Sequence, residues 1–189
     1  MSGPVSSRAE PHARVILDLC AGSGSWSAPY AEVGYDVRRI DLPTDVRLLD
    51  YPGQVHGILA APPCTVFANS GARWTRTEAE LRDALSIVDA CLRLVAVCRP
   101  QWWALENPVG KLRRWLGPPQ FSFQPNEYGD PYTKRTLLWG KFAAPIATEA
   151  AVAATEGSKM WRLPPSPERQ ALRSVTPAGF ARAFREANP

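Results

Sequence analysis

Polar residues able to do chemistry gather in four short clusters, each directly after an apolar segment. These clusters are Asp18 to Gly24, Asp41 with Asp45, Pro62-Pro63-Cys64 and Glu106-Asn107-Pro108. Two prolines before Cys64 stiffen its loop, and a thiolate held there would be a nucleophile. Glu106 ends an apolar run, and a carboxyl at such a rim tends to keep its proton and donate it. The structural alternatives are a buried, inert cysteine and a turn carboxylate.

The first cluster, Asp18-Leu-Cys-Ala-Gly-Ser-Gly24, has the form of a strand-to-helix turn. Its glycines let a ligand approach the backbone closely. Asp41 follows Gly24 by 17 positions and could accept hydrogen bonds from both hydroxyls of a ribose. The third glycine of a dinucleotide-binding turn is missing, which argues against NAD and favours a nucleoside without phosphates, such as S-adenosylmethionine (SAM). A plain turn with a solvated aspartate is the alternative.

The elements that must position these clusters alternate along the chain. Short apolar runs predict strands. Helices are predicted by apolar residues that recur every three to four positions, by the Thr77/Glu80 capping pair and by Pro177 in a first turn. The expected strands are 15–19, 35–40, 57–60, 102–105 and 136–142, and the expected helices are 26–33, 77–98 and 177–187. This order predicts an α/β fold, a doubly wound and mostly parallel sheet with helices on both faces. Ligands bind at the carboxyl ends of such strands, where all four clusters fall.

Size and composition limit the class of protein. The chain has 189 residues, 45% hydrophobic and 21% charged, which predicts one globular domain and excludes wholesale disorder. No apolar run approaches the roughly 18 residues of a membrane span, and residues 1–14 lack a signal-peptide core. We therefore expect a soluble cytoplasmic protein. The cysteines at 20, 64, 91 and 98 are spaced too widely for a Cys-x-x-Cys zinc pair, so no metal is expected.

The basic charge is concentrated near the end of the chain. Residues 159–189 hold six basic and two acidic side chains, a surplus of 6 − 2 = +4, which equals the whole net charge. Arginine outnumbers lysine 18 to 4, and its planar fork suits phosphate. This favours nucleic-acid contact, with a solvated helix face as the alternative.

Together the motifs resemble those of the cytosine-C5 DNA methyltransferases. The matching segments are Asp18 to Gly24, Pro62-Pro63-Cys64-Thr-Val-Phe-Ala-Asn-Ser-Gly71, Glu106-Asn107-Pro108 and Arg135-Thr-Leu-Leu-Trp-Gly140, with a weaker match at Arg173-Ser-Val-Thr176-Pro. The resemblance implies a Rossmann-like SAM-dependent methyltransferase with Cys64, Glu106 and Arg135 as catalytic residues. Cys64 would attack C6 of a flipped-out cytosine, Glu106 would protonate N3, and Arg135 would hold O2.

The resemblance also implies where SAM and DNA would bind. Asp41 would lie at the ribose of SAM and Asp45 near its adenine amine, with Trp26 and Pro62 also in the pocket. The methionine part would be surrounded by residues of the glycine turn: Asp18, Cys20, Ala21, Gly22, Ser23 and Gly24. The loop from Phe67 to Thr75 would close over the base. Its candidate nucleic-acid contacts are Asn69, Ser70, Gly71, Arg73 and Trp74, and Lys134 is a further one.

The chain departs from the family pattern in three places. In this chain Pro131 and Thr133 stand at the positions of the glutamine and the first arginine of the family's Gln-x-Arg-x-Arg segment. The family's Gly-Asn-Ser motif is not visible. Only residues 141–172 remain for target recognition. We expect a core at 14–140, a reduced recognition or linker region at 141–172 and a C-terminal helix at 173–189. This resembles compact, phage-encoded members with little sequence preference, and we expect a recognition context of one or two bases.

Three alternative functions remain open. The same chemistry could act on RNA or transfer a modified one-carbon group, because Glu106 and Arg135 would read the same base edge. A non-catalytic DNA-binding relative would account for the shortened chain, although DNA binding needs none of Cys64, Glu106 and Arg135. An amino-methyltransferase is disfavoured, since that class places an aromatic residue after Pro-Pro.

Overall fold

The fold is built on one six-stranded sheet. The computed structural model describes residues 13–69, 75–147, 151–158, 163, 166 and 169–189. The strands stand in the order β2-β1-β3-β4-β6-β5, and β1 to β4 are parallel. Only β6 runs against its neighbours β4 and β5. The strands are β1 (Val15–Leu19), β2 (Asp36–Ile40), β3 (Gly57–Ala60), β4 (Trp102–Pro108), β5 (Phe121–Phe123) and β6 (Thr136–Lys141).

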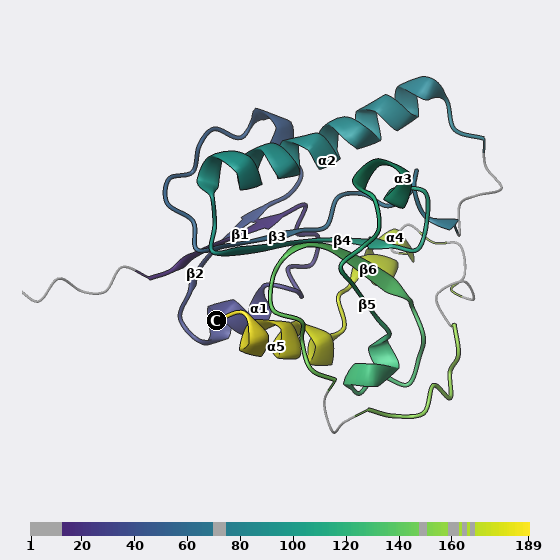
Figure 1. Cartoon of the computed structure of the whole chain (residues 1–189). Coiled ribbons are helices and arrows are strands. Elements are labelled where there is room, and N and C mark those ends of the chain that lie inside the picture. The colour runs from purple at the N-terminus through teal and green to yellow at the C-terminus, as the bar shows by residue number, and fades with distance from the viewer. Residues whose placement is uncertain (1–12, 70–74, 148–150, 159–162, 164–165, 167–168) are drawn as a thin grey trace, which may run out of the picture.

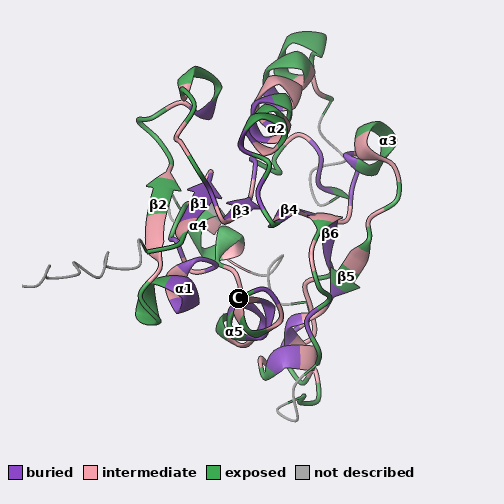
Figure 2. Ribbon diagram, turned by 60° about the vertical axis from the view of Figure 1, so that its left-hand side comes forward, coloured by how far each residue is buried: buried purple, intermediate pink, exposed green. Residues whose placement is uncertain are grey.

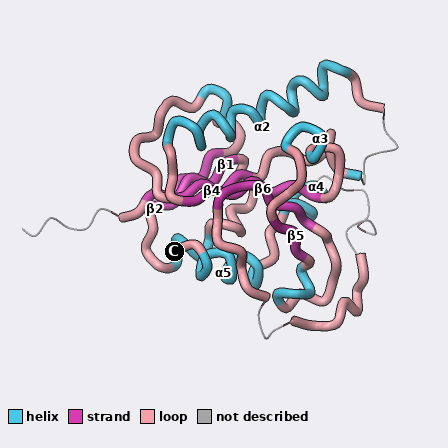
Figure 3. Tube along the Cα trace, viewed as in Figure 1, coloured by secondary structure: helices cyan, strands magenta, loops and turns pink. Residues whose placement is uncertain are grey.

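Helices cover both faces of this sheet (Figures 1 and 3). On one face lies the long helix α2 (Glu78–Cys98), with the 3₁₀ turn η1 (Val46–Leu48) and the short helix α3 (Arg113–Leu116). On the other face lie α1 (Ala28–Glu32), η3 (Pro125–Tyr128) and α5 (Ala178–Ala187). The remaining helix, α4, spans Arg169–Ser174. The expected doubly wound α/β fold with a mostly parallel sheet is thereby confirmed.

The central strands are buried on both sides, as covered parallel sheets require. Along β1, Leu17 and Leu19 face the α2 layer while Ile16 faces the α5 layer. The α5 layer is aromatic: the rings of Phe123 and Phe180 stack with centroids 3.5 Å apart. Figure 2 shows the buried central strands between helices whose outer surfaces are exposed.

Helix α2 begins as the sequence predicts. The Thr77 hydroxyl accepts a hydrogen bond from Glu80 N at 3.1 Å, and Thr77 N donates to Glu80 Oε2 at 2.7 Å. This reciprocal pair satisfies donors that the first turn leaves without partners. The helix ends at Arg99, whose φ of 47° is left-handed.

Several boundaries differ from the sequence predictions. The fourth strand does not end before Glu106-Asn107-Pro108 but includes those residues, because β6 pairs with them. The first helix is shorter than 26–33 and spans Ala28–Glu32, and the short elements β5, α3 and α4 were not predicted. Within the described residues, no helix is long and apolar enough to cross a membrane.

The aromatic layer should determine whether α5 stays docked. We expect Phe180→Ala to lower the free energy of unfolding by about 3–5 kcal/mol, since it removes a fully buried ring and leaves a cavity. Ile146→Ala is the matched control: Ile146 is 83% exposed, and its loss should change stability by at most about 0.5 kcal/mol. Urea denaturation followed by circular dichroism measures both, and equal effects would contradict this account of the core.

Candidate active site

The polar clusters meet at the carboxyl edge of the parallel strands. The glycine turn follows β1, Asp41 follows β2, and the Cys64 loop follows β3. Glu106 lies on β4, one residue beyond Leu105, which pairs with Ala60 at the end of β3. Because β2, β1, β3 and β4 are consecutive in the sheet, their ends bring these residues to one side of the molecule.

Cys64 and Glu106 interact electrostatically. Burial raises the pKa of the Cys64 thiol, and the negative charge of Glu106 raises it further, while Lys134 and Arg173 oppose the rise. Burial also raises the pKa of Glu106, again opposed by Lys134. Burial therefore shifts the titration of both groups toward higher pH. Cys64 is nonetheless exposed as a residue, so it remains open to a reagent or substrate.

A buried amide joins the loop that carries Cys64 to the strand that carries Glu106. Asn107 is fully buried, and its Nδ2 donates a hydrogen bond of 3.0 Å to the carbonyl of Pro62. The loop is held again further on, where Asn69 N donates to Val109 O at 3.0 Å and Lys111 N to Phe67 O at 2.7 Å. The Cys64 loop and the end of β4 therefore form one connected unit.

Gly110 allows this close contact. A Cβ atom at Gly110 would lie 2.0 Å from the carbonyl oxygen of Phe67, a distance that no side chain tolerates. The residue also forms an isolated antiparallel bridge with Ala68. A glycine is required here because two backbones touch.

Lys134 and Arg173 supply the positive charge beside the pair. The sequence assigned Lys134 to nucleic-acid contact, and the structure places its charge against both Glu106 and Cys64. Its Nζ donates to the carbonyl of Arg173 at 2.6 Å. Arg173 was missed as a member of this site, because no local pattern links a residue of α4 to a loop after β3.

Arg135 stands in a different position from the other two catalytic candidates. It is exposed and immediately precedes β6, whose first residue Thr136 pairs with Pro108. Its backbone thus lies at the same edge as the Glu106 segment. Across the described residues its side chain makes no hydrogen bond or ion pair, and its contact with a cytosine O2 stays a prediction.

The glycine turn offers an open backbone surface. Cys20, Gly22 and Gly24 have φ values of 56°, 51° and 70°, all left-handed. A Cβ at Gly22 would meet a single heavy atom within 4 Å, Ser174 Oγ at 3.9 Å, whereas one at Gly24 would strike the Arg39 side chain at 2.6 Å. A side-chain atom at Gly22 would therefore make only an ordinary contact, with Ser174, whereas Arg39 covers Gly24.

Asp18 lies beneath this turn. Its carboxyl is 1% exposed and accepts a hydrogen bond of 2.5 Å from Ser27 Oγ. Burial raises its pKa to about 6, against the lowering effects of the Ser27 hydrogen bond and the Arg39 charge. A buried carboxyl that ionises near neutral pH costs stability, which makes it a candidate functional group.

The C-terminal segment joins the two halves of the site. Thr176 N donates to Ser25 Oγ at 2.9 Å, and Ser23 Oγ donates to the same hydroxyl at 3.0 Å. Ser174 lies over Gly22, and Arg173 acts on Cys64. Residues 173–176 thus run from the glycine turn to the nucleophile loop.

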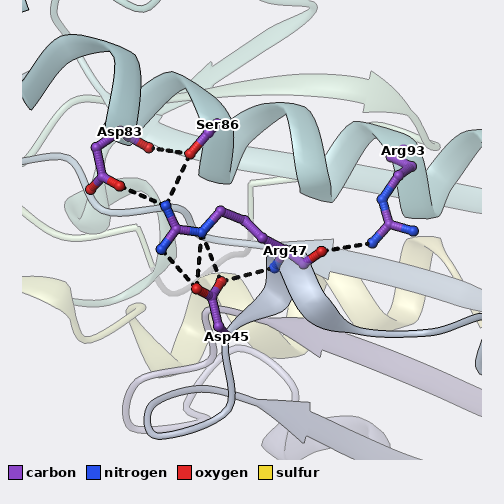
Figure 4. Close-up of polar contacts among 5 residues, drawn as sticks. All are labelled: Asp45, Arg47, Asp83, Ser86 and Arg93. Atoms are coloured by element: carbon purple, nitrogen blue, oxygen red, sulfur yellow. Dashed lines mark hydrogen bonds and ion pairs between the residues drawn. The ribbon is translucent and has the colours of Figure 1, made fainter. Parts of the chain in front are cut away.

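The remaining predicted cofactor residues divide into free and engaged groups. Asp41 is exposed and its carbonyl accepts from Thr44 N at 2.9 Å. Asp45 is engaged: Figure 4 shows its carboxylate in an ion pair with Arg47 at 2.7 Å, and Arg47 also binds Asp83 at 2.6 Å. These Arg47 hydrogen bonds hold the pKa of Asp45 below its usual range. Asp45 also borders an open depression of about 540 Å³ that includes Thr44.

Trp26, Cys20 and Pro62 have structural contacts as well. The Trp26 ring is 2% exposed and packs edge-on against Phe184 at 5.5 Å, so a ligand at the turn would meet its backbone. Cys20 packs against the α2 layer, where its hydrogen bond raises the pKa of the Cys91 thiol. Pro62 is buried and is held by Asn107.

Part of the predicted DNA-closing loop lies outside the described residues: Ser70, Gly71, Arg73 and Trp74. Asn69 is described and exposed. In the described ranges, no group of three or more His, Cys, Asp or Glu residues is arranged to hold a metal ion.

The fold of this chain is similar to that of known structures. No family model matches the chain, and no curated protein sequence matches it. A crystal structure described provisionally as a DNA modification methyltransferase encoded within an E. coli prophage is similar, with a TM-score of 0.49 and 18% identity. The match covers 68% of this chain and 47% of the other, so this chain spans about half that protein's length. The functional conclusion must therefore come from the site itself.

Asp18 should make stability depend on pH. Its folded pKa of about 6 exceeds the ordinary value of 3.8, so the folded state holds a proton that the unfolded state releases between these values. Stability therefore falls as pH rises from about 4 to about 6, by about 3 kcal/mol relative to Asp18→Asn, which cannot ionise. Urea denaturation of both proteins between pH 4 and 8 measures this difference, and parallel pH curves would contradict a raised pKa.

The charges around Cys64 should shift the pH profile of its alkylation. Lys134→Gln removes an opposing positive charge and should move the midpoint to higher pH, whereas Glu106→Gln should move it to lower pH. Iodoacetamide labelling followed by mass spectrometry gives each profile. Arg82→Gln, a change in an exposed ion pair on α2, should leave the midpoint unchanged. Shifts of the same sign in both site variants would refute the charge arrangement.

Proposed function

We propose that this chain is a SAM-dependent methyltransferase that methylates C5 of cytosine in DNA. One observation carries the proposal: Cys64, in the loop after β3, and Glu106, on the neighbouring parallel strand β4, interact electrostatically beside Lys134. The open glycine turn lies at the same edge. A thiol and a proton-donating carboxyl are the two groups needed to activate a pyrimidine ring, and simple DNA binding requires neither.

Cytosine C5 is a poor nucleophile until a group adds at C6. In the proposed mechanism, the sulfur of Cys64 forms a bond to C6 while Glu106 donates a proton to N3, so the ring becomes a neutral enamine. Burial raises the pKa of Glu106, and this favours the protonated form that can donate. Such attack on the ring face requires a base that is flipped out of the duplex or single-stranded.

The thiol must lose its proton before it attacks. Its pKa is raised in the free protein, so at neutral pH Cys64 rests as a thiol. Lys134 and Arg173 counter this rise and would stabilise the thiolate at the moment of attack. The sulfur releases its proton to solvent water, and the thiolate then adds to C6. Glu106 becomes a carboxylate as it protonates N3, so the negative charge passes from sulfur to Glu106 and the total charge does not change in this step.

SAM fits the residues on the other side of the site. The backbone of the left-handed turn from Cys20 to Gly24 carries no side chain at Gly22, where a Cβ would meet only Ser174 Oγ, at 3.9 Å. The exposed Asp41 at the tip of β2 can accept from ribose hydroxyls. When bound there, SAM supplies an electrophilic methyl group on its sulfonium sulfur. Asp45 could accept from the adenine amine only after its carboxylate releases Arg47. After methylation, a base removes the C5 proton and the Cys64 sulfur leaves C6.

Transfer of radiolabelled methyl groups from SAM tests this function directly. We expect label on cytosine in DNA, and a gel-stable adduct with 5-fluorocytosine duplex that requires Cys64. Cys64→Ser should abolish both, whereas the matched control Cys98→Ser, at the last residue of α2, should retain both. Glu106→Gln should slow turnover by about 10²–10⁴-fold while SAM binding survives.

Other outcomes separate the alternatives. Label on RNA alone would change the substrate, and an adduct without transferred label would indicate a different one-carbon donor. No label and no adduct on any nucleic acid, despite measurable DNA binding, would overturn the proposal in favour of a non-catalytic relative. Unchanged transfer by Cys64→Ser would remove the nucleophile assignment.

A further inference from the structure

A cluster of positive charge lies beside the Cys64 loop and takes no part in the chemistry described above. Lys111, Arg113 and Arg114 line an open depression of about 330 Å³, together with Asn69, Val109 and Gly110. No acidic side chain lines it. We call Lys111, Arg113, Arg114 and the adjacent Trp115 the basic surface.

The three cations of the basic surface are unpaired across the described part of the chain. Two arginines elsewhere on the same side of the sheet have carboxylate partners: Arg47 binds Asp83 at 2.6 Å, and Arg82 binds Glu78 at 2.6 Å. Neither a hydrogen bond nor an ion pair engages the side chains of Lys111, Arg113 or Arg114 in those ranges. Three neighbouring cations without counter-charges repel one another, and an anionic partner would relieve that repulsion.

Trp115 adds an exposed aromatic ring to these charges. It is 43% exposed, and its ring meets the fully buried ring of Phe67 edge-on, with centroids 6.0 Å apart. A large apolar ring held at the surface beside cations is a common arrangement for packing against the sugars and bases of a nucleic acid.

The basic surface is attached rigidly to the nucleophile loop. Lys111 N donates to Phe67 O at 2.7 Å, and both Phe67 N and Ala68 N donate to the Cys64 carbonyl, at 3.0 and 2.8 Å. In Figures 1 and 2, α3 lies on the same side of the sheet as α2, beyond the end of β4. A strand bound there would be held at a fixed position relative to Cys64.

We infer that the basic surface binds the phosphate backbone of the DNA strand that presents its cytosine to Cys64. This inference rests on the proposed function for the identity of the base, but the binding of DNA can be measured without methyl transfer. The surface lies outside the predicted closing loop and the Arg135 segment, so it would be an additional DNA contact. Phosphate contacts position a strand without reading its sequence, which suits a chain with only 32 residues at positions 141–172 for recognition.

Salt-dependent DNA binding tests the inference. The double variant Arg113→Gln/Arg114→Gln should raise the Kd for a 20-base-pair duplex roughly tenfold or more at about 0.1 M salt. It should also reduce the magnitude of the slope of log K against log salt by about 1.8. The matched control, Arg38→Gln/Arg82→Gln, removes the same charge from paired arginines on β2 and α2 and should change neither. Fluorescence anisotropy measures both values.

Trp115→Leu separates the aromatic contribution from the charges. It should weaken binding without altering the salt slope, because no counterion is released by a ring. The inference would be overturned if the two double variants lost the same amount of DNA affinity, or if the Arg113/Arg114 variant lost none. Binding of RNA but not DNA by the wild type would also overturn it. Failure of the proposed function would appear differently, as absent methyl transfer with the DNA-binding pattern intact.

Discussion

The hydrogen bond from Asn107 to Pro62 is the contact on which the site most depends. It is made by a fully buried amide and links the loop after β3 to the last residues of β4. Parallel pairing brings these strands together only as far as Ala60 and Leu105. Beyond that point the amide, and the backbone contact allowed by Gly110, keep Cys64 beside Glu106. A loop free of these ties would sample many thiol positions, and the pair would lose its shared environment.

Each half of the site holds a carboxyl whose pKa is raised by burial. Asp18 accepts a hydrogen bond from the neutral Ser27 hydroxyl, and the charges of Arg39 and Lys134 lower the pKa values of Asp18 and Glu106, respectively. Burial without a close ion pair favours protonation, so each carboxyl sits where a proton is held more tightly than in water. The core around them, apolar on both sheet faces, supplies the stability that tolerates their burial.

The aromatic layer on the second face connects folding to the site. Phe180 and Phe184 of α5 are fully buried against Phe123 and Trp26, which anchors the helix. The preceding segment is thereby held in place, so that Thr176 reaches Ser25 and Arg173 faces Cys64. The final helix thus acts at a distance, by fixing the segment that spans the glycine turn and the nucleophile loop.

The sequence by itself determined the order of elements, the capping box at Thr77 and the convergence of four polar clusters. Each of these follows from local spacing or from the rule that parallel strands end at one edge. Only the tertiary structure decided that Glu106 lies within β4, that Arg173 joins Cys64, and that Trp26 packs in the core. These depend on the pairing of β6 and the docking of α5, contacts between residues far apart in the chain. No local sequence pattern predicts these contacts, because burial and electrostatic interactions arise only when segments distant in the sequence pack against one another.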